Sequence, residues 1–118
     1  MELKILEAGP PVRVALIGRL DIDEVARIET KFVAATATQR RAVIVDLSGV
    51  TFIGSLGVGM LMGAAHALRR HGAAMVLLDP QSLVARVLEV SHIGDVVRVV
   101  QGIEEARRAI ASGPGTGR

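Results

Sequence analysis

The stretch from Ala42 to Leu47 constrains the fold more than any other part of the chain. It reads A-V-I-V-D-L, an almost unbroken apolar run that is rich in β-branched residues. A strand with one face in water alternates between apolar and polar residues, whereas a continuous apolar run is typical of a strand that is covered on both faces. We therefore expect this strand to lie inside a sheet with helices packed on it, which is an α/β arrangement.

The rest of the pattern predicts further strands and helices in succession. Short apolar runs predict strands at 3–6, 12–17, 74–78 and 96–100, and the last is short enough to be an edge strand. A helix is expected at 56–70. Apolar residues at helical spacing predict the buried faces of three other helices. These faces consist of Val25, Ile28, Phe32 and Ala35 in the first, Leu83, Val84, Val87 and Leu88 in the second, and Ile103, Ala106 and Ile110 in the third. The expected fold class is α/β, a mixed sheet of about five strands with about four helices in the order β-β-α-β-α-β-α-β-α. We expect this domain to cover residues 1–111, with a flexible tail at 112–118.

Turn and capping residues indicate where these elements end. The stretch Gly18 to Asp21 is expected to end the second strand. Asp21 or Asp23 can cap the first helix, because a short carboxylate accepts hydrogen bonds from the unpaired N–H groups of a first turn. Ser48-Gly49 is expected to follow the central strand. Asp79-Pro80 predicts the start of the third helix, with the aspartate as cap and the proline in the first turn.

The composition limits the classes of function that the chain can have. Its 118 residues suit one domain, and the net charge of +2 comes with arginines that are scattered rather than clustered. Only two residues are aromatic, which disfavours proteins that stack nucleic-acid bases. There is no cysteine, and His66 and His71 do not have the spacing of a zinc-binding helix. No apolar stretch approaches the roughly 20 residues that span a bilayer. We expect a cytoplasmic protein with no nucleic-acid partner, no metal and no cofactor.

The sequence has only a superficial likeness to a serine hydrolase. Ser55, Asp79 and His92 follow one another in the order of a hydrolase triad. The nucleophile turn of those enzymes needs glycine two residues before and after the serine, and here Gly57 fits but Ile53 does not. We therefore expect a binding domain rather than an enzyme.

The glycine-rich stretch with Gly54, Gly57 and Gly59 lies where a strand should end and a helix begin. Unpaired N–H groups and the helix dipole can bind an anion at such a position. The spacing matches neither the dinucleotide fingerprint nor the P-loop, and no lysine follows. A nucleotide- or phospholipid-binding module is one interpretation, and a tight strand-to-helix turn with close helix packing is the other.

Three polar residues are expected near this turn. Asp21 and Asp46 each lie near the end of a predicted strand or in its exit loop, and Ser55 opens the helix that follows the central strand. Ligands of open α/β sheets bind beyond the carboxyl ends of the strands. The topology therefore predicts that the three are neighbours. The alternative is that Asp21 only caps a helix and that Asp46 only pairs with a backbone N–H or an arginine.

Three stretches agree in order and spacing with a known family. They are Gly18-Arg19-Leu20-Asp21, the run V-I-V-D-L-S-G-V-T-F-I at 43–53, and Ser55-Leu56-Gly57-Val58-Gly59. With the segments between and after them, they resemble the STAS family of anti-sigma factor antagonists and related transporter domains over residues 3 to 110. The resemblance implies a regulator that acts by partner switching. Such a protein binds an anti-sigma factor that is also a serine kinase, and phosphorylation at the start of the second helix breaks the complex.

The turn itself departs from the family pattern. The common form is roughly Asp-Ser-(Ser/Thr)-Gly-(Leu/Ile)-Gly, with the phosphoacceptor immediately before the first of these glycines. This chain has Leu56 at that position and Gly54 in place of the acidic residue. Ser55 is the only adjacent hydroxyl and is the candidate phosphoacceptor. Either Ser55 has taken over that role, or Leu56 makes the domain a constitutive binder, a scaffold or a subunit of a transport complex.

The resemblance also implies a partner-binding surface around the turn. Its expected members are Asp21, Asp46, Gly54, Ser55, Leu56, Gly57, Val58 and Gly59. The expected partner is a protein, an anti-sigma factor with serine-kinase activity. The exposed last strand and the aliphatic second helix can in addition support a weak homodimer.

Overall fold

Five strands form one mixed sheet in the order β1-β2-β3-β4-β5. The computed structural model describes residues 1–113, so residues 114–118 of the predicted tail lie outside the described residues. β1 (Glu2–Glu7) is antiparallel to β2 (Val12–Leu20), and β2, β3 (Val43–Ile53), β4 (Met75–Leu78) and β5 (Arg98–Val100) are parallel to one another. The helices are α1 (Ile22–Ala35), α2 (Ser55–Arg70), α3 (Ser82–Val90) and α4 (Ile103–Ala111), with short 3-10 turns η1 (Ala37–Gln39) and η2 (Ile93–Asp95). The predicted fold class and element order are confirmed.

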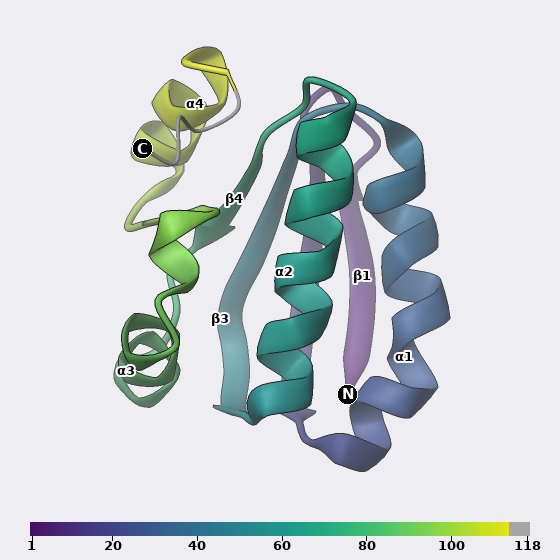
Figure 1. Ribbon diagram of the computed structural model, residues 1–118, viewed down its shortest axis with the longest axis vertical. Coiled ribbons are helices and arrows are strands. Elements are labelled where there is room, and N and C mark those ends of the chain that lie inside the picture. Colours follow the sequence, from purple (N-terminus) through teal and green to yellow (C-terminus); the bar gives the residue numbers. More distant parts are fainter. Residues whose placement is uncertain (114–118) are drawn as a thin grey trace.

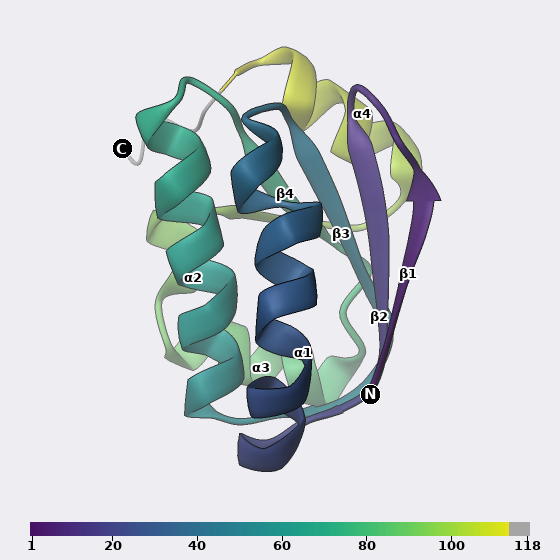
Figure 2. The ribbon, with the colours of Figure 1, turned by 90° about the vertical axis from the view of Figure 1, so that its right-hand side faces the viewer.

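Helices cover both faces of the sheet, with α1, α2 and α3 on one face and α4 on the other (Figure 1, Figure 2). Successive residues of β3 point to opposite faces, so Val43 and Val45 pack beneath α1 and α2 while Ile44 packs under α4 with Val76 and Leu78. All five side chains are almost inaccessible to solvent. The two-sided coverage explains why the apolar run in β3 is continuous.

β2 and β3 are longer than the sequence pattern predicts. The prediction that β2 ends at Ile17 is wrong, because the strand continues to Leu20 and pairs with β3 as far as Ile53. The pairing of β2 with β3 changes register between Ala15 and Ile17 and again after Gly18, and it continues beyond both irregularities. Gly18 has a φ of 116°, a conformation that glycine adopts without strain. The extension carries both strands to one end of the domain.

The start of the third helix also differs from the prediction. Asp79 and Pro80 do not cap α3, which begins two residues later with Gln81 as its N-cap. Asp79 instead has a φ of 55°, and its Oδ1 accepts a hydrogen bond of 2.8 Å from the N–H of Gly102. It therefore connects the end of β4 to the start of α4. The predicted inner face of α3 is also corrected, because Leu83 is 61% exposed.

No helix within residues 1–113 has both the length and the hydrophobicity of a membrane span.

Candidate functional site

The ends of β2 and β3 bring the starts of α1 and α2 together. Leu20 and Ile53 are paired in the sheet, and the N–H of Gly54 donates a hydrogen bond of 3.1 Å to the carbonyl oxygen of Leu20. Each helix begins within two residues of its strand, so the two helix N-termini are held side by side. Between them lies a hollow of about 450 Å³, whose lining is Arg19, Leu20, Asp21, Ile22, Asp23, Phe52, Gly54, Ser55 and Leu56. The structure thus brings Asp21, Gly54, Ser55 and Leu56 to one place, as predicted.

Asp21 is the N-cap of α1. Its Oδ1 accepts a hydrogen bond of 3.0 Å from the N–H of Glu24, and its Oδ2 lies 3.5 Å from Nε of Arg19. The hydrogen bond from Glu24 and then the Arg19 guanidinium lower the pKa of the Asp21 carboxyl, because both interactions favour its charged form. The prediction that Asp21 or Asp23 caps the helix is confirmed for Asp21. One oxygen of Asp21 is thereby committed to the fold.

Arg19 and Phe52 also line the hollow. The guanidinium carbon of Arg19 lies 4.4 Å from the centre of the Phe52 ring, a cation–π contact. Sequence reasoning missed this pair, because the two residues belong to different strands and only the β2–β3 register makes them neighbours. The Gly-x-Leu-Asp match did include Arg19, but it gave that position no role.

Ser55 and Leu56 form the exposed start of α2. Ser55 is solvent-exposed, and its hydroxyl makes no hydrogen bond to any residue in the described part of the chain. Leu56 is 52% exposed, and Ile22 across the hollow is 70% exposed. An accessible hydroxyl therefore lines the same hollow as two exposed aliphatic side chains, an arrangement that suits contact with another protein.

Two predicted members of the surface are buried. Gly57 packs on Leu20, and Val58 is 7% exposed within the core. A Cβ added to Gly57 would lie 2.9 Å from Cγ1 of Ile53 and 3.1 Å from Cβ of Leu20. Gly57 therefore permits the close approach of α2 to the strand ends, which was the structural interpretation of the glycine-rich turn. Both residues are buried in the domain, and the prediction that they contact a partner stays a prediction.

Asp46 lies away from the other acidic residue of the predicted surface. It pairs with Ala15 on one side and Leu78 on the other, in the middle of β3, whereas Asp21 follows the end of β2. Its Oδ1 accepts a hydrogen bond of 2.9 Å from the N–H of Ser48. The prediction that Asp46, Asp21 and Ser55 are neighbours is wrong for Asp46, because β3 continues well beyond it. Its pairing with a backbone N–H was the alternative.

A second hollow adjoins Ser55 on the side of α3. It measures about 340 Å³ and is lined by Ser55, Val58, Arg86, Val87, Val90 and Ser91. Val90 is 68% exposed. The sequence analysis placed no functional residue on α3. The helix nevertheless has more apolar residues than the two that are buried, Val84 and Leu88. Exposed apolar surface therefore flanks Ser55 on both sides.

The remaining chemical patterns do not form a site. The carboxylate of Asp79, which the sequence places second in a hydrolase-like order that we do not favour, accepts a hydrogen bond from the N–H of Gly102. Within residues 1–113 no three His, Cys, Asp or Glu side chains lie close enough together to hold a metal. The predictions of no metal, no cofactor and no enzymatic activity stay predictions.

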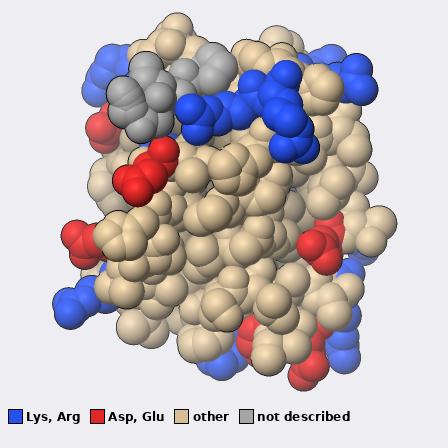
Figure 3. Space-filling model, in the orientation of Figure 1, with Lys and Arg blue, Asp and Glu red and all other residues tan. Residues whose placement is uncertain are grey.

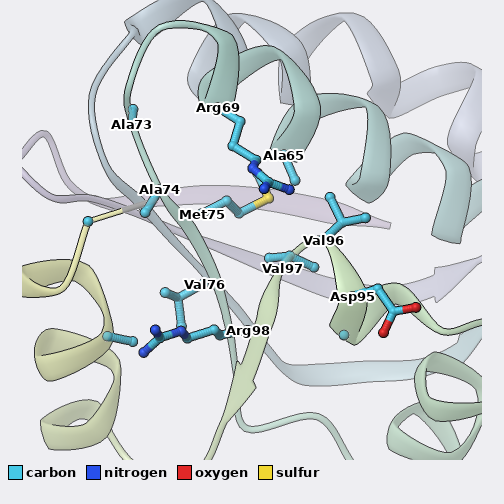
Figure 4. Close-up of a pocket in the computed structure, with 13 residues that line it drawn as sticks. Ala65, Arg69, Ala73, Ala74, Met75, Val76, Asp95, Val96, Val97 and Arg98 are labelled. Atoms are coloured by element: carbon cyan, nitrogen blue, oxygen red, sulfur yellow. The ribbon is translucent and has the colours of Figure 1, made fainter. Parts of the chain in front are cut away.

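A further hollow of about 320 Å³ lies at the other end of α2 (Figure 4). Arg69 and Arg98 both line it, and Met75 and Val97 form part of its wall. The two arginine side chains point in different directions, Arg69 toward Met75 and Arg98 past Val76 toward α4 (Figure 4). They do not converge on one position in this hollow (Figure 4).

Comparison with known proteins identifies the family and the fold of the chain. The sequence model of the STAS domain matches residues 3–106. An anti-sigma-B factor antagonist of Staphylococcus aureus is 25% identical over 87 residues, which are 74% of this chain and 81% of the relative. The solved structure of an anti-sigma-factor antagonist domain protein from Planctomyces limnophilus has a TM-score of 0.78 and 25% identity, covering 92% of this chain and 97% of that one.

The unphosphorylated form of the anti-sigma factor antagonist SpoIIAA is also similar. It has a TM-score of 0.70 and 25% identity, and the match covers 92% of this chain and 94% of that one. The Bacillus protein has also been solved in a phosphorylated form. The predicted resemblance to antagonists of this type is confirmed.

Proposed function

Because the chain belongs to the STAS domain family, we propose that it binds an anti-sigma factor through the surface around the start of α2. The accessible part of this surface consists of Arg19, Asp21, Ile22, Ser55, Leu56 and Gly59. Its relatives are named as antagonists of anti-sigma factors, so the partner class follows from the family. The exposed residues around the start of α2 support this position for the surface.

The observation that carries the proposal is the pair of exposed aliphatic side chains beside Ser55. Ile22 and Leu56 are 70% and 52% exposed, on two helices whose starts are held together by the Gly54–Leu20 hydrogen bond. Fully burying one such side chain stabilises a complex by about 1.5–3 kcal/mol. The partner is a protein that offers an apolar contact to both.

Phosphorylation of Ser55 would oppose such a complex. A phosphate adds a charge of about −1.5 to −2 and three strongly hydrated oxygens. Covering Ile22 and Leu56 would then remove water from a charged group, which is costly unless the partner offers a matching cation. The start of α2 itself tolerates the phosphate, because helix N-termini favour negative charge. The modification therefore acts on the complex and leaves the fold intact.

Partner binding is tested by placing a charge on the apolar surface. Leu56→Asp and Ile22→Asp should each lower the affinity for the anti-sigma factor by at least about tenfold, as expected when an interfacial aliphatic contact is lost. Ile5→Asp is the matched control, because Ile5 is 60% exposed but lies on the edge strand β1. Calorimetry on the three folded variants gives the affinities. Equal affinities for all three variants and the unmodified protein would remove this surface from consideration.

The phosphorylation switch is tested with the anti-sigma kinase and mass spectrometry. Phosphate on Ser55 that is lost in Ser55→Ala would make Ser55 the acceptor. The variant Leu56→Ser restores a hydroxyl at the family's usual position and serves as a control for kinase activity. If Leu56→Ser is phosphorylated at residue 56 and the unmodified chain is not phosphorylated, the domain is a constitutive binder.

A further inference from the structure

The outer face of α2 contains two glycines that the fold does not require. Gly59 and Gly63 are solvent-exposed, and a Cβ added to either would meet no atom within 4 Å. Glycine inside a helix is less favourable than alanine by about 0.5–1 kcal/mol. Gly57, by contrast, is needed for packing on Leu20. The two outer glycines therefore lower the stability of the domain without improving its internal packing.

The same face is free of charge along most of its length. Its exposed residues Leu56, Gly59, Gly63 and His66 follow one another at helical spacing, and α2 contains no Asp, Glu, Lys or Arg before Arg69. Figure 3 shows the broad uncharged surface over the middle of α2, with basic side chains above it. Two glycines four residues apart allow the backbone of another helix to approach closely.

We propose that this face binds the same face of a second copy of the chain, with the two α2 helices antiparallel. A two-fold symmetric contact needs a surface that is complementary to itself. Gly59 and Gly63 are equally distant in sequence from Leu61, and so are Leu56 and His66. A two-fold axis near Leu61 therefore places Gly59 against the partner's Gly63 and Leu56 against the partner's His66.

The charges at the two ends of the face favour the antiparallel arrangement. The C-terminal end of α2 carries Arg69 and Arg70. Beside its N-terminal end lies Asp23, which lines the same hollow as Ser55 and has no ion-pair partner within residues 1–113. Antiparallel helices bring Arg70 of one copy toward Asp23 of the other, whereas parallel helices would bring the basic ends together. Arg86 of α3 lines the hollow on the other side of Ser55. It would repel Arg69 and Arg70 of the second copy, so the C-terminal end of that copy's α2 is directed toward α1.

The dimer and the anti-sigma factor would compete for one surface. The contact covers Ser55 and Leu56, so a chain within the dimer cannot bind through them. One helix face per copy is smaller than the roughly 800 Å² per partner of stable complexes. The dimer should therefore be weak and dependent on concentration. Its existence does not depend on the proposed binding of an anti-sigma factor.

Sedimentation equilibrium of the full chain tests the dimer without any other protein. Between about 10 µM and about 1 mM the unmodified chain should change from monomer toward dimer, as expected for a small interface. Gly63→Arg should raise the dissociation constant at least about tenfold. The matched control is Ala111→Arg, because Ala111 is also an exposed small residue of a helix but lies on α4, which packs on the opposite face of the sheet. It should dimerise like the unmodified chain.

A charge exchange tests the antiparallel geometry. Arg70→Asp should weaken the dimer, because it places a carboxylate opposite Asp23 of the other copy. Adding Asp23→Arg to the same chain should restore the dimer, because the two positions then again carry opposite charges. A monomer throughout the concentration range, or an unchanged dimer in Gly63→Arg, overturns the proposal. Loss of anti-sigma factor binding in Gly63→Arg, with the unmodified chain monomeric, also overturns it and assigns the face to that partner instead.

Discussion

Gly57 of α2 packs directly on Leu20 at the end of β2. A Cβ at Gly57 would lie 3.1 Å from Cβ of Leu20 and 3.2 Å from its carbonyl oxygen. That carbonyl oxygen also accepts the hydrogen bond from Gly54. Leu20 is therefore the point at which the second helix is held against the first strand-to-helix junction. The contact helps to set the distance between Ile22 and Leu56, which the proposed partner would contact together.

Gly57→Val should destabilise the domain. The added carbons would have to displace Ile53 or the backbone of Leu20, and overpacking of this kind costs about 1–3 kcal/mol. Urea unfolding measures the change. Because the loss arises in the fold, a failure of this variant to bind a partner says nothing about the binding surface.

Gly59→Ala should have the opposite effect. The position is open and exposed, so the alanine gains helix propensity of about 0.5–1 kcal/mol without a clash. Urea unfolding at a concentration where the chain is monomeric gives the comparison. A lower stability than that of the unmodified chain would show that Gly59 has a packing role within one copy.

Gly54→Asp should stabilise α2. Gly54 is the N-cap, has extended backbone angles and provides no side-chain hydrogen bond to the helix. An added Cβ would lie no closer than 3.6 Å to its neighbours. An aspartate can cap the first turn and interact with the helix dipole, which together contribute about 0.3–1 kcal/mol. Thermal unfolding of Gly54→Asp and Gly54→Ala distinguishes the effect of the carboxylate from that of adding a Cβ, since only aspartate should raise the melting temperature.

The Asp21 carboxylate should make stability depend on pH in the acidic range. Its pKa is lowered in the folded chain by the hydrogen bond from Glu24 and by Arg19. The stabilisation is complete above the unfolded value of about 3.9 and is lost as the pH falls through the folded value. Asp21→Asn keeps a capping oxygen but removes the charge. The stability difference between this variant and the unmodified chain should therefore shrink as the pH is lowered from neutral to below the folded value.

Urea unfolding over that pH range provides the measurement. A difference between Asp21→Asn and the unmodified chain that stays constant at all pH values would contradict the assigned role of the carboxylate. Glu104→Gln is a suitable control, because Glu104 is an exposed acidic residue in the first turn of another helix, α4.

Asp79 should tolerate asparagine better than alanine. Its φ of 55° is a conformation that asparagine adopts readily, and the amide oxygen can still accept the hydrogen bond from Gly102. Alanine loses both advantages, at a cost of about 1–3 kcal/mol. Chemical unfolding of the two variants gives the comparison, and equal stabilities would contradict the proposed role of this contact.

Local pattern in the sequence was sufficient for much of the fold. The helical spacing of Val25, Ile28, Phe32 and Ala35 predicts the buried face of α1, and all four are buried. The continuous apolar run predicts the two-sided burial of β3. Such features depend on residues within a few positions of one another, where backbone periodicity fixes which side chains share a face.

Pairing between distant strands decided the rest. The length of β3 beyond Asp46 separates that residue from Asp21 and Ser55, and the register of β2 on β3 brings Arg19 onto Phe52. Gly57 and Gly59 look alike in the sequence, yet one is packed on Leu20 and the other is open to solvent. The sequence by itself determined the order of the elements and the turn at Ser55, because both follow from local periodicity and glycine spacing. Only the tertiary structure decided which side chains surround Ser55, because strand register and helix packing join residues that are far apart in the chain.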